Sequence, residues 1–331
     1  MKLVKTPLRI SYVGGGTDYP SYYMNNEGCG VIAAAINQYV YIYSHKLSPI
    51  AKEQIRFTYR ETESVNAIAE LKHPVLREML KLRNWPEKTN FGTFSDLPSG
   101  VGLGGSSSFA VGLAHLILDT GSNEIDPHVL AELAVRVERD ELKEPGGIQD
   151  HYVAAFGGLR KYEFKQSGVE VSPKIMSQDS VSYLEERQML IWLEETRDSE
   201  THAAVTESEI GKSNSYLKEM TDLFQETDKI FSEDLGGAQT FEKIKEAVTL
   251  GWSYKKRFTS ELSPIVQSVE TVLSKFSDVG YKLCGAGGSG FLLVLAEPDI
   301  LAQIKNTLPG YSVLHPKISL LGSSVQSPVW E

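Results

Sequence analysis

The chain has 331 residues, of which 41% are hydrophobic and 23% charged, and its formal net charge is −10 at pH 7. One hydrophobic core rarely supports this length, so we expect two domains. The acidic balance, without a basic run to offset it, argues against a nucleic-acid partner and requires any anionic ligand to be held locally.

The two cysteines, Cys29 and Cys284, lie far apart, without a Cys-x-x-Cys pair or a Cys/His cluster. This pattern predicts neither a disulfide framework nor a zinc site. No run of about 18 apolar residues occurs, and the first residues are too polar for a signal peptide. We therefore expect a soluble cytoplasmic protein that has no membrane partner.

The first part of the chain alternates strand and helix patterns, with Val, Ile and Tyr concentrated in the second strand. The expected elements are strands at 1–13 and 28–47, a helix at 63–83, a strand at 88–95, helices at about 107–119 and 127–143, and short strands near 159–172 and 188–194. The helix at 127–143 opens with Asp126-Pro127, an N-cap residue followed by proline at the first helical position.

The C-terminal part is mainly helical and closes with a mixed pattern. Its expected elements are helices near 200–233, 238–258 and 263–277, the stretch Tyr281-Lys-Leu-Cys before a glycine loop, a strand at 291–296, a helix at 298–308 and a final strand near 311–318. The closing β–β–α–β order predicts an α+β unit with its helices on one face.

A run rich in glycine and serine lies between Pro98 and Phe109, just before an apolar helical stretch. Glycines let backbone N–H groups turn toward a ligand, and the positive end of the following helix attracts an anion. The serines can cap that helix or hold a metal. The segment therefore predicts a phosphate cradle, and the alternative is an ordinary glycine-rich turn with a serine N-cap.

Two stretches, Gly100 to Gly105 and Gly285 to Gly290, match the dinucleotide pattern G-x-G-x-x-G. That fingerprint requires a buried strand before it and a helix after it. The first match follows turn residues and the second precedes a strand, so neither fits. The chain also lacks a Walker phosphate loop and the sequence signatures of protein kinases.

Glu138 falls in the middle of the apolar arc of the helix at 127–143. A carboxylate there needs a cation, a metal or good hydrogen bonds, so it is either a metal ligand or a salt-bridged core residue. Glu141 shares the arc but lies near the helix end, where solvent can satisfy it. Asp150 follows the Gly146-Gly147 turn and is well placed to be a catalytic base.

The N-terminal segment places Arg9 in a strand and Asp18 after three glycines. An arginine suits the γ-phosphate of ATP or a developing oxyanion, and a loop aspartate suits sugar hydroxyls. The alternatives are an exposed strand arginine and an aspartate that stabilises its own turn.

Taken together, Thr6–Pro20, Pro98–Phe109 and Lys282–Gly290 resemble, in order, the three motifs of the GHMP kinases. The resemblance covers nearly the whole chain. It implies an α+β GHMP kinase fold, with a ribosomal protein S5 domain 2-like N-terminal domain at 1–185 and a ferredoxin-like C-terminal domain at 186–331.

Within that family, the first motif and the Gln-Asp150-His-Tyr stretch are most similar to kinases of D-glycero-D-manno-heptose 7-phosphate. This implies transfer of the ATP γ-phosphate to the anomeric C1 hydroxyl, which gives a heptose 1,7-bisphosphate. The alternatives are a fucokinase- or galactokinase-like enzyme and a non-catalytic sugar sensor. A sensor does not need a base, so the presence of Arg9, Ser106, Glu138 and Asp150 together argues against it. The protein is expected to be a monomer or a homodimer.

The resemblance also implies a role for each matched residue. Asp150 would be the catalytic base, Arg9 would orient it, and Glu138 would bind Mg²⁺ with Ser106, or with Ser107, because Gly105 replaces the first serine of the usual motif. The implied ATP-binding residues are Pro98, Gly100, Val101, Gly102, Leu103, Gly104, Gly105, Ser106, Ser107 and Ser108. The implied substrate-binding residues are Gly15, Gly16, Thr17, Asp18, Tyr19, Gly287 and Arg197.

A substrate that already carries a phosphate at its far end needs a cation of its own. The candidates are Arg160, Lys161, Arg197 and the run Lys255-Lys256-Arg257, and each is otherwise a solvated surface charge. Gly15-Gly16 stands where galactokinases have Glu-His, which leaves room for a bulkier sugar.

Overall fold

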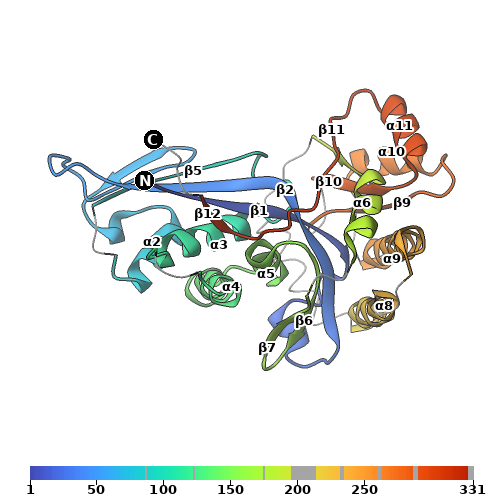
Figure 1. Cartoon of the computed structure of the whole chain (residues 1–331), viewed down its shortest axis with the longest axis horizontal. Helices are drawn as coiled ribbons and strands as arrows, with labels where there is room; N and C mark the ends of the chain where they lie inside the picture. Colours follow the sequence, from blue (N-terminus) through green and yellow to red (C-terminus); the bar gives the residue numbers. More distant parts are fainter. Residues whose placement is uncertain are drawn as a thin grey trace.

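Two sheets organise the part of the chain that the computed structural model describes, which comprises residues 1–85, 88–121, 124–173, 176–194, 214–231, 235–258, 262–285 and 290–326. Figure 1 shows the larger sheet running through the elongated half of the molecule and the smaller sheet at the opposite, mainly helical end. The α+β prediction is confirmed.

The larger sheet has eight strands, six of them in the order β12-β1-β2-β5-β3-β4, with β6 paired to β2 and β7 paired to β6. Its strands are β1 (Lys2–Val13), β2 (Cys29–Lys46), β3 (Ile55–Thr58), β4 (Thr62–Val65), β5 (Thr89–Ser95), β6 (Leu159–Lys165), β7 (Gly168–Val171) and β12 (Ser324–Gln326). Strand β12 comes from the end of the chain and lies antiparallel to β1, so it returns to the first sheet.

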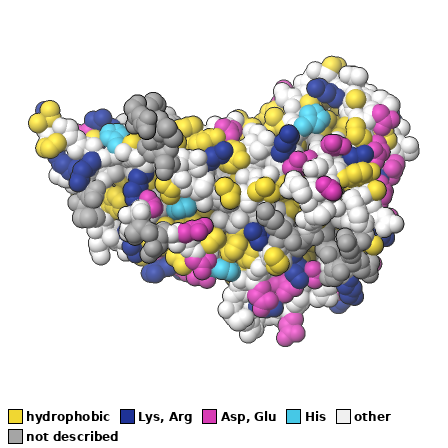
Figure 2. Space-filling view, viewed as in Figure 1, with side chains coloured by type: hydrophobic (Ala, Val, Ile, Leu, Met, Phe, Trp, Pro, Cys, Tyr) yellow, Lys and Arg dark blue, Asp and Glu magenta, His cyan; other side chains and the backbone are white. Residues whose placement is uncertain are grey.

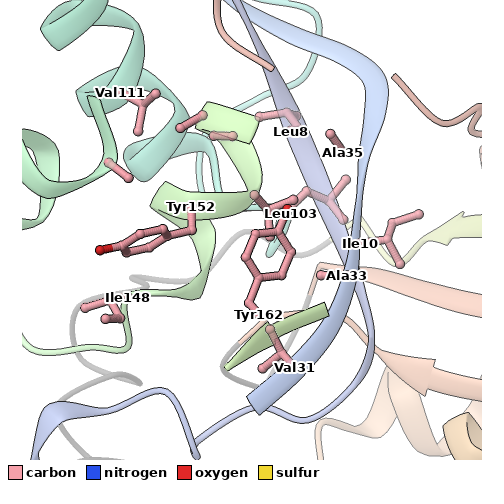
Figure 3. Packing of buried hydrophobic residues seen from close by; sticks show 14 of the residues in the cluster. Leu8, Ile10, Val31, Ala33, Ala35, Leu103, Val111, Ile148, Tyr152 and Tyr162 are labelled. Atoms are coloured by element: carbon pink, nitrogen blue, oxygen red, sulfur yellow. The ribbon is translucent and has the colours of Figure 1, made fainter. Parts of the chain in front are cut away.

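The long strand β2 holds this sheet together. Its first half pairs with β6, its second half pairs with β5, and β1 runs antiparallel along most of its length. Residues 29–36 are buried without a break, because helices α3 (Gly105–Leu118), α5 (Gln149–Phe156) and α8 (Asn214–Phe231) all pack against β2. Figure 3 shows side chains from β1, β2 and α5 meeting in this core.

Helices on one side of the larger sheet carry much of the candidate site. They are α2 (Pro74–Leu82), α3, α4 (Pro127–Val135) and α5, with the short helix α1 (Pro20–Tyr23) and the 3-10 turn η1 (Ile68–Glu70) at the edges. A π-helical segment, η2 (Arg136–Glu141), continues directly from α4. Such π turns are rare and often accompany functional sites.

The smaller sheet is antiparallel, in the order β11-β8-β10-β9. Its strands are β8 (Gln188–Trp192), β9 (Gly280–Leu283), β10 (Phe291–Leu295) and β11 (Val313–Leu314). The helices at this end are α6 (Gln178–Glu186), α8, α9 (Gly237–Phe258), α10 (Pro264–Leu273) and α11 (Pro298–Thr307). A second hydrophobic core, which includes Ile191, Trp252 and Leu292, holds this end together.

Most predicted elements are confirmed, but the helix expected at 63–83 is wrong. Its first part forms β4 and η1, and the helix begins only at Pro74. Glu63 explains the break, because its buried carboxylate accepts hydrogen bonds from the backbone N–H groups of Lys72 and His73 at 2.6 and 3.1 Å. The prediction also missed β3, α5, α6 and β12.

Two expected helices and the expected domain boundary have different outcomes. The helix expected at 127–143 is α-helical only to Val135 and then turns π-helical. Residues 200–213 of another expected helix lie outside the described residues. The domain boundary at 185/186 stays a prediction. None of the helices in the described ranges combines the length and the apolar character that crossing a bilayer requires.

Candidate active site

An arginine and an aspartate from opposite ends of the N-terminal half form a two-point ion pair. Arg9 donates from Nε to Oδ1 of Asp150 at 2.5 Å and from Nη2 to Oδ2 at 2.6 Å. Arg9 follows a register shift in β1 between Pro7 and Leu8, and Asp150 lies in the first turn of α5. A bulge of this kind re-aims a side chain, and the paired contacts fix both groups.

The electrostatics keep this arginine charged. Burial by itself lowers the pKa of Arg9, but the adjacent Asp150 carboxylate outweighs burial and raises the pKa above its usual value. The side chain of Arg9 is 7% exposed and that of Asp150 is 20% exposed, so the carboxylate is the more accessible partner.

The glycine-rich loop wraps over this pair. Glycines at 100, 102 and 104 have φ values of 77°, 81° and 77°, and they alternate with Val101 and Leu103, whose side chains are buried. Gly104 is the N-cap of α3, and a Cβ there would lie 3.1 Å from Oδ2 of Asp150. The buried side chains of Val101 and Leu103 anchor the loop, and the positive φ values of its glycines give the backbone a conformation that suits a phosphate cradle.

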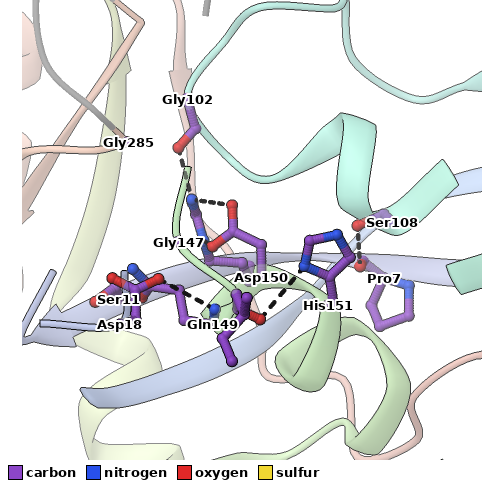
Figure 4. A network of polar contacts seen from close by, with 12 residues as sticks. Pro7, Ser11, Asp18, Gly102, Ser108, Gly147, Gln149, Asp150, His151 and Gly285 are labelled. Atoms are coloured by element: carbon purple, nitrogen blue, oxygen red, sulfur yellow. Dashed lines mark hydrogen bonds and ion pairs between the residues drawn. The ribbon is translucent and has the colours of Figure 1, made fainter. Parts of the chain in front are cut away.

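This loop packs against the third motif, backbone to backbone. A Cβ on Gly285 would lie 2.7 Å from Cα of Gly102, and a Cβ on Gly290 would lie 2.5 Å from the carbonyl oxygen of Val101. Nη1 of Arg9 in turn donates to the carbonyl oxygen of Gly102 at 2.8 Å, and Figure 4 shows Gly102 and Gly285 above Asp150. The first, second and third motifs therefore meet at one place.

Glu138 is 1% exposed, as its position in the apolar arc predicts, and both of its carboxylate oxygens accept hydrogen bonds. Ser106 donates from Oγ to Oε1 at 2.8 Å, and His151 donates from Nε2 to Oε2 at 2.7 Å. Burial raises the pKa of Glu138, but His151, Arg139 and Ser106 together bring it below the usual value. The buried side chain is therefore an ionised carboxylate.

The serines of the second motif differ in where their hydroxyls point. Oγ of Ser106 contacts Glu138, whereas Oγ of Ser108 donates to the carbonyl oxygen of Pro7 at 2.8 Å and so ties α3 to β1. Ser107 is buried. Of the two alternatives for a metal-binding serine, Ser106 is the one that lies beside the carboxylate.

Arg139 forms hydrogen bonds with the turn between Glu138 and Asp150. It donates from Nη1 to the carbonyl oxygen of Glu144 at 3.1 Å and from Nη2 to that of Gly147 at 3.0 Å. Nη2 also lies 3.8 Å from Oε2 of Glu138. Arg139 lies in the π-helical segment η2, one residue after Glu138.

Asp18 is buried near Asp150. Oδ1 accepts the N–H of Gly16 and Oδ2 accepts the N–H of Gln149, both at 3.1 Å. A Cβ on Gly147 would lie 1.8 Å from Oδ2, so only glycine fits under this carboxylate. Burial is the largest cause of the raised pKa of Asp18, and the nearby Asp150 carboxylate adds to it.

The other predicted substrate residues take different positions. Thr17 donates to the carbonyl oxygen of Gly30 at 3.1 Å, so its hydroxyl faces β2, and Tyr19 is buried. Helix α8 covers the Gly15-Gly16 turn, where a Cβ on Gly16 would meet the Leu217 side chain at 3.0 Å. Gly287 and Arg197 lie outside the described residues.

Sequence reasoning missed His151, Arg139 and Lys282 as members of the site. The one signal for His151 was its place beside Asp150, but α5 was not predicted, so no face could be assigned to the histidine. Lys282 donates to the carbonyl oxygen of Tyr12 at 3.4 Å. That contact joins two strands separated by most of the chain, which no local pattern reveals.

Comparison with known proteins shows which proteins the chain is similar to. The family model described as GHMP kinases N terminal domain matches residues 67–158, which include the glycine loop, Glu138 and Asp150. Over 313 residues, the chain is 28% identical to the D-glycero-alpha-D-manno-heptose 7-phosphate kinase of Campylobacter jejuni, covering 90% of this chain and 91% of that protein. Residues 67–158 thus carry a match to the GHMP kinase N-terminal domain.

Two further similar proteins are more distant in sequence. The galactokinase of Pyrococcus furiosus is 23% identical and covers 89% of both chains. A solved structure described as a D-glycero-D-manno-heptose 1-phosphate kinase from Bacteroides thetaiotaomicron superposes with a TM-score of 0.78 at 20% identity, covering both chains completely. At that identity the likeness shows the GHMP kinase fold. GHMP kinases use ATP.

Proposed function

We propose that this protein is a GHMP kinase that transfers the γ-phosphate of ATP to the anomeric C1 hydroxyl of D-glycero-D-manno-heptose 7-phosphate. The observation that carries the reaction class is the two-point Arg9–Asp150 pair, which lies under the glycine loop and next to Asp18. The heptose 7-phosphate kinase relative, which matches along nine-tenths of the chain, supports the choice of acceptor.

Asp150 is proposed as the base. The Arg9 contacts hold its carboxylate rigidly, and the 20% exposure of the side chain leaves it accessible to an acceptor hydroxyl. An anomeric hydroxyl is relatively acidic, so one positioned carboxylate within hydrogen-bond reach is enough to take its proton. Removing that proton at the moment of attack makes the hydroxyl oxygen a better nucleophile.

Arg9 has two proposed tasks. It orients Asp150, and its permanently charged guanidinium stabilises the negative charge on the phosphoryl group in transit. The glycine loop and the first N–H groups of α3 would hold the phosphates of ATP. These groups are fixed before substrate binds, so little reorganisation is needed during the reaction.

Ser106 and Glu138 are the proposed ligands for Mg²⁺. Their oxygens lie 2.8 Å apart, and hydroxyl and carboxylate oxygens are the hard donors that this ion prefers. Mg²⁺ usually takes only one or two protein ligands beside substrate phosphates, and no group of three or more His, Cys, Asp and Glu side chains within the described ranges could hold an ion. Bound there, it would neutralise phosphate charge.

Asp18 is proposed to accept hydrogen bonds from ring hydroxyls. Backbone N–H groups already hold both of its oxygens, which leaves lone pairs free for a substrate. No heavy atom lies within 4 Å of a Cβ added to Gly15, which leaves open space there for a seven-carbon sugar, whereas the Leu217 side chain lies beside Gly16.

The test is an ADP-release assay over a panel of sugars offered with and without a terminal phosphate. The expected result is the highest kcat/KM on heptose 7-phosphate, with weak turnover of galactose and fucose. Strong activity on unphosphorylated fucose or galactose, with none on heptose 7-phosphate, would overturn the choice of acceptor and favour a fucokinase- or galactokinase-like enzyme.

A further inference from the structure

His151 is a buried histidine that links helix α5 to the proposed metal ligand. Its side chain is fully buried in the first turn of α5, directly after the proposed base in the sequence. Nε2 donates to Oε2 of Glu138 at 2.7 Å, and Nδ1 lies 3.4 Å from the carbonyl oxygen of Ile148. Both ring nitrogens thus face oxygen atoms, which fixes the orientation of the imidazole ring.

The two carboxylate oxygens of Glu138 have different surroundings. Oε1 accepts a hydrogen bond from Ser106, in the first turn of α3, at 2.8 Å. Oε2 accepts the hydrogen bond from His151 and lies 3.8 Å from Nη2 of Arg139. Protein groups therefore hold Oε2, while Oε1 lies beside the serine with which it is proposed to bind Mg²⁺.

A carboxylate that is held by one oxygen is better prepared to bind a metal with the other. The last torsion of a glutamate side chain is soft, so an unrestrained carboxylate rotates readily. The rigid imidazole ring of His151 removes this freedom before the metal arrives, because its donor nitrogen contacts Oε2. Groups that orient a ligand in this way contribute to metal affinity although they do not touch the metal.

Helix α5 connects this contact to the base. Asp150 and His151 are consecutive residues, and their side chains leave the helix about 100° apart. Asp150 receives both hydrogen bonds from Arg9, whereas His151 donates to Glu138. Figure 4 shows Asp150 on the side of Gly102 and His151 on the side of Ser108. The first turn of α5 therefore fixes the proposed base relative to the proposed metal ligand.

Backbone hydrogen bonds hold α5 at both ends. At its start, the N–H groups of Ile148 and Gln149 donate to Asp18, to the carbonyl oxygen at 3.2 Å and to Oδ2 at 3.1 Å. Near its end, the carbonyl oxygen of Ala154 accepts from the N–H of Ser323 at 2.9 Å. Because the helix is fixed in this way, the hydrogen bond from His151 has a fixed direction.

The contact with a carboxylate distinguishes His151 from the other histidines in the part of the chain that the structure describes. Among them, only His151 lies within 4.0 Å of a carboxylate oxygen. His115, for comparison, contacts the hydroxyl of Ser323 at 3.0 Å. The alternative explanation for His151 is purely structural, in which the imidazole only compensates a buried carboxylate. The two explanations differ in what they predict for metal binding.

We propose that His151 is a positioning residue for the metal site, which holds Oε2 of Glu138 so that Oε1 stays turned toward Ser106 and Mg²⁺. This inference rests on the proposed function and deepens it, because it assigns the order of the metal ligand to the residue that follows the base. The side chain of His151 is fully buried, so it acts through Glu138 and not on the substrates.

The test measures how much Mg²⁺ strengthens the binding of a non-hydrolysable ATP analogue. Its Kd is determined by calorimetry in Mg²⁺ and in EDTA, and the ratio of the two values reports the contribution of the metal. In His151→Leu, which lacks the donor, this ratio is expected to fall at least about tenfold. The Kd in EDTA should stay within about twofold of wild type, because the nucleotide itself does not contact His151.

Two amide variants make the comparison sharper and remain informative if His151→Leu does not fold. In His151→Gln, Nε2 lies the same number of bonds from Cα as in histidine, so it can still donate to Oε2. In His151→Asn, the amide nitrogen lies one bond nearer to the backbone. We expect the glutamine variant to keep the ratio within about threefold of wild type and the asparagine variant to resemble His151→Leu.

His115→Leu is the matched control for lost stability. His115 is half-buried in the last turn of α3, far along that helix from Ser106, and its ring bonds a hydroxyl outside the site. Its replacement removes a histidine hydrogen bond, as His151→Leu does, and its Tm is measured beside the others. The ratio for His115→Leu should match wild type whatever its Tm.

A double variant shows whether His151 acts through the carboxylate. In a Glu138→Gln background the proposed metal ligand is already impaired, so adding His151→Leu should change the ratio by no more than about twofold. A further fall as large as the one in the wild-type background would mean that His151 acts independently of Glu138, which would overturn the proposal.

Three other results also decide the matter. A wild-type ratio in His151→Leu, with only a lower Tm, would show a purely structural histidine. A raised Kd in EDTA would mean that His151 shapes the nucleotide site itself. If either result occurs while the wild-type protein phosphorylates heptose 7-phosphate, the positioning role is wrong and the proposed function stands. If nucleotide binding by the wild-type protein does not respond to Mg²⁺, the proposed metal site fails, and the role of His151 fails with it.

Discussion

The charged side chains on the two sides of the candidate active site have different kinds of partner. On the N-terminal side, the carboxylates of Asp18, Glu138 and Asp150 each accept at least two hydrogen bonds from named donors. On the C-terminal side, Lys255 and Lys282 contact carbonyl oxygens. The comparison teaches that hydrogen bonds already hold the carboxylates on the first side, whereas on the second side burial lowers the pKa values of both lysines.

Replacing Asp150, the proposed base, should reduce activity the most. Asp150→Asn keeps the shape of the side chain and one acceptor for Arg9 but cannot take a proton at neutral pH. We expect kcat to fall by about 10²–10⁴-fold with ATP affinity largely unchanged, measured by ADP release and by nucleotide titration. Turnover within tenfold of wild type would remove Asp150 from this role.

Removing the charge of Glu138 should have a smaller, metal-specific effect. Glu138→Gln keeps a hydrogen-bond acceptor for Ser106 but loses the anionic oxygen. The Mg²⁺ concentration for half-maximal activity is expected to rise about 10–100-fold, and calorimetric titration of Mn²⁺ with ADP present should show the same weakening. An unaltered metal titration would count against this carboxylate as a ligand.

A methyl group added at position 147, next to the Asp18 carboxylate, tests how rigidly the N-terminal side of the site is packed. In Gly147→Ala the new Cβ would start 1.8 Å from Oδ2 of Asp18, so the turn or the carboxylate must move. We expect a loss of about 1–3 kcal/mol in unfolding free energy and a raised KM for the acceptor. Gly310→Ala is the control, because no heavy atom lies within 4 Å of its added Cβ. Equal behaviour of the two variants would contradict the packing argument.

On the C-terminal side, Lys282 should make the free energy of unfolding depend on pH. The pKa of Lys282 is about 8 in the folded protein and 10.5 ordinarily, so between these values the unfolded chain binds the extra proton. The unfolding free energy contributed by this lysine therefore rises with pH across that window. We expect Lys282→Met to remove on the order of 1 kcal/mol of this rise, relative to wild type, in urea unfolding at pH 7.5 and 10.5. Parallel pH profiles for the two proteins would contradict the buried, unpaired charge.

Local patterns in the sequence predict the parts of the site that depend on backbone conformation and helix phase. The alternation of glycine with Val101 and Leu103 indicates the loop. The position of Glu138 on the apolar side of its helix indicates that its side chain is buried. The same reasoning fails where distant contacts decide the structure. Glu63 accepts hydrogen bonds from backbone N–H groups nine and ten residues away, just before α2. Residue propensities do not predict such a contact.

The pairings inside the site are the least predictable feature. The hydrogen bond of His151 to Glu138 depends on a π turn and on the short helix α5, and neither has a clear sequence signature. Lys282 has no carboxylate within ion-pair distance in the part of the chain that the structure describes, and this depends on every described element around it. A lysine next to a glycine motif looks the same in sequence whether it meets solvent, an aspartate or only carbonyl oxygens.

The most direct test of the central claim is ³¹P NMR of the product formed from heptose 7-phosphate and ATP. The account predicts a new phosphate resonance coupled to the anomeric proton, beside an unchanged 7-phosphate signal, with one ADP released per product. A new phosphate on any other oxygen, or no product from heptose 7-phosphate while an unphosphorylated sugar is consumed, would contradict it.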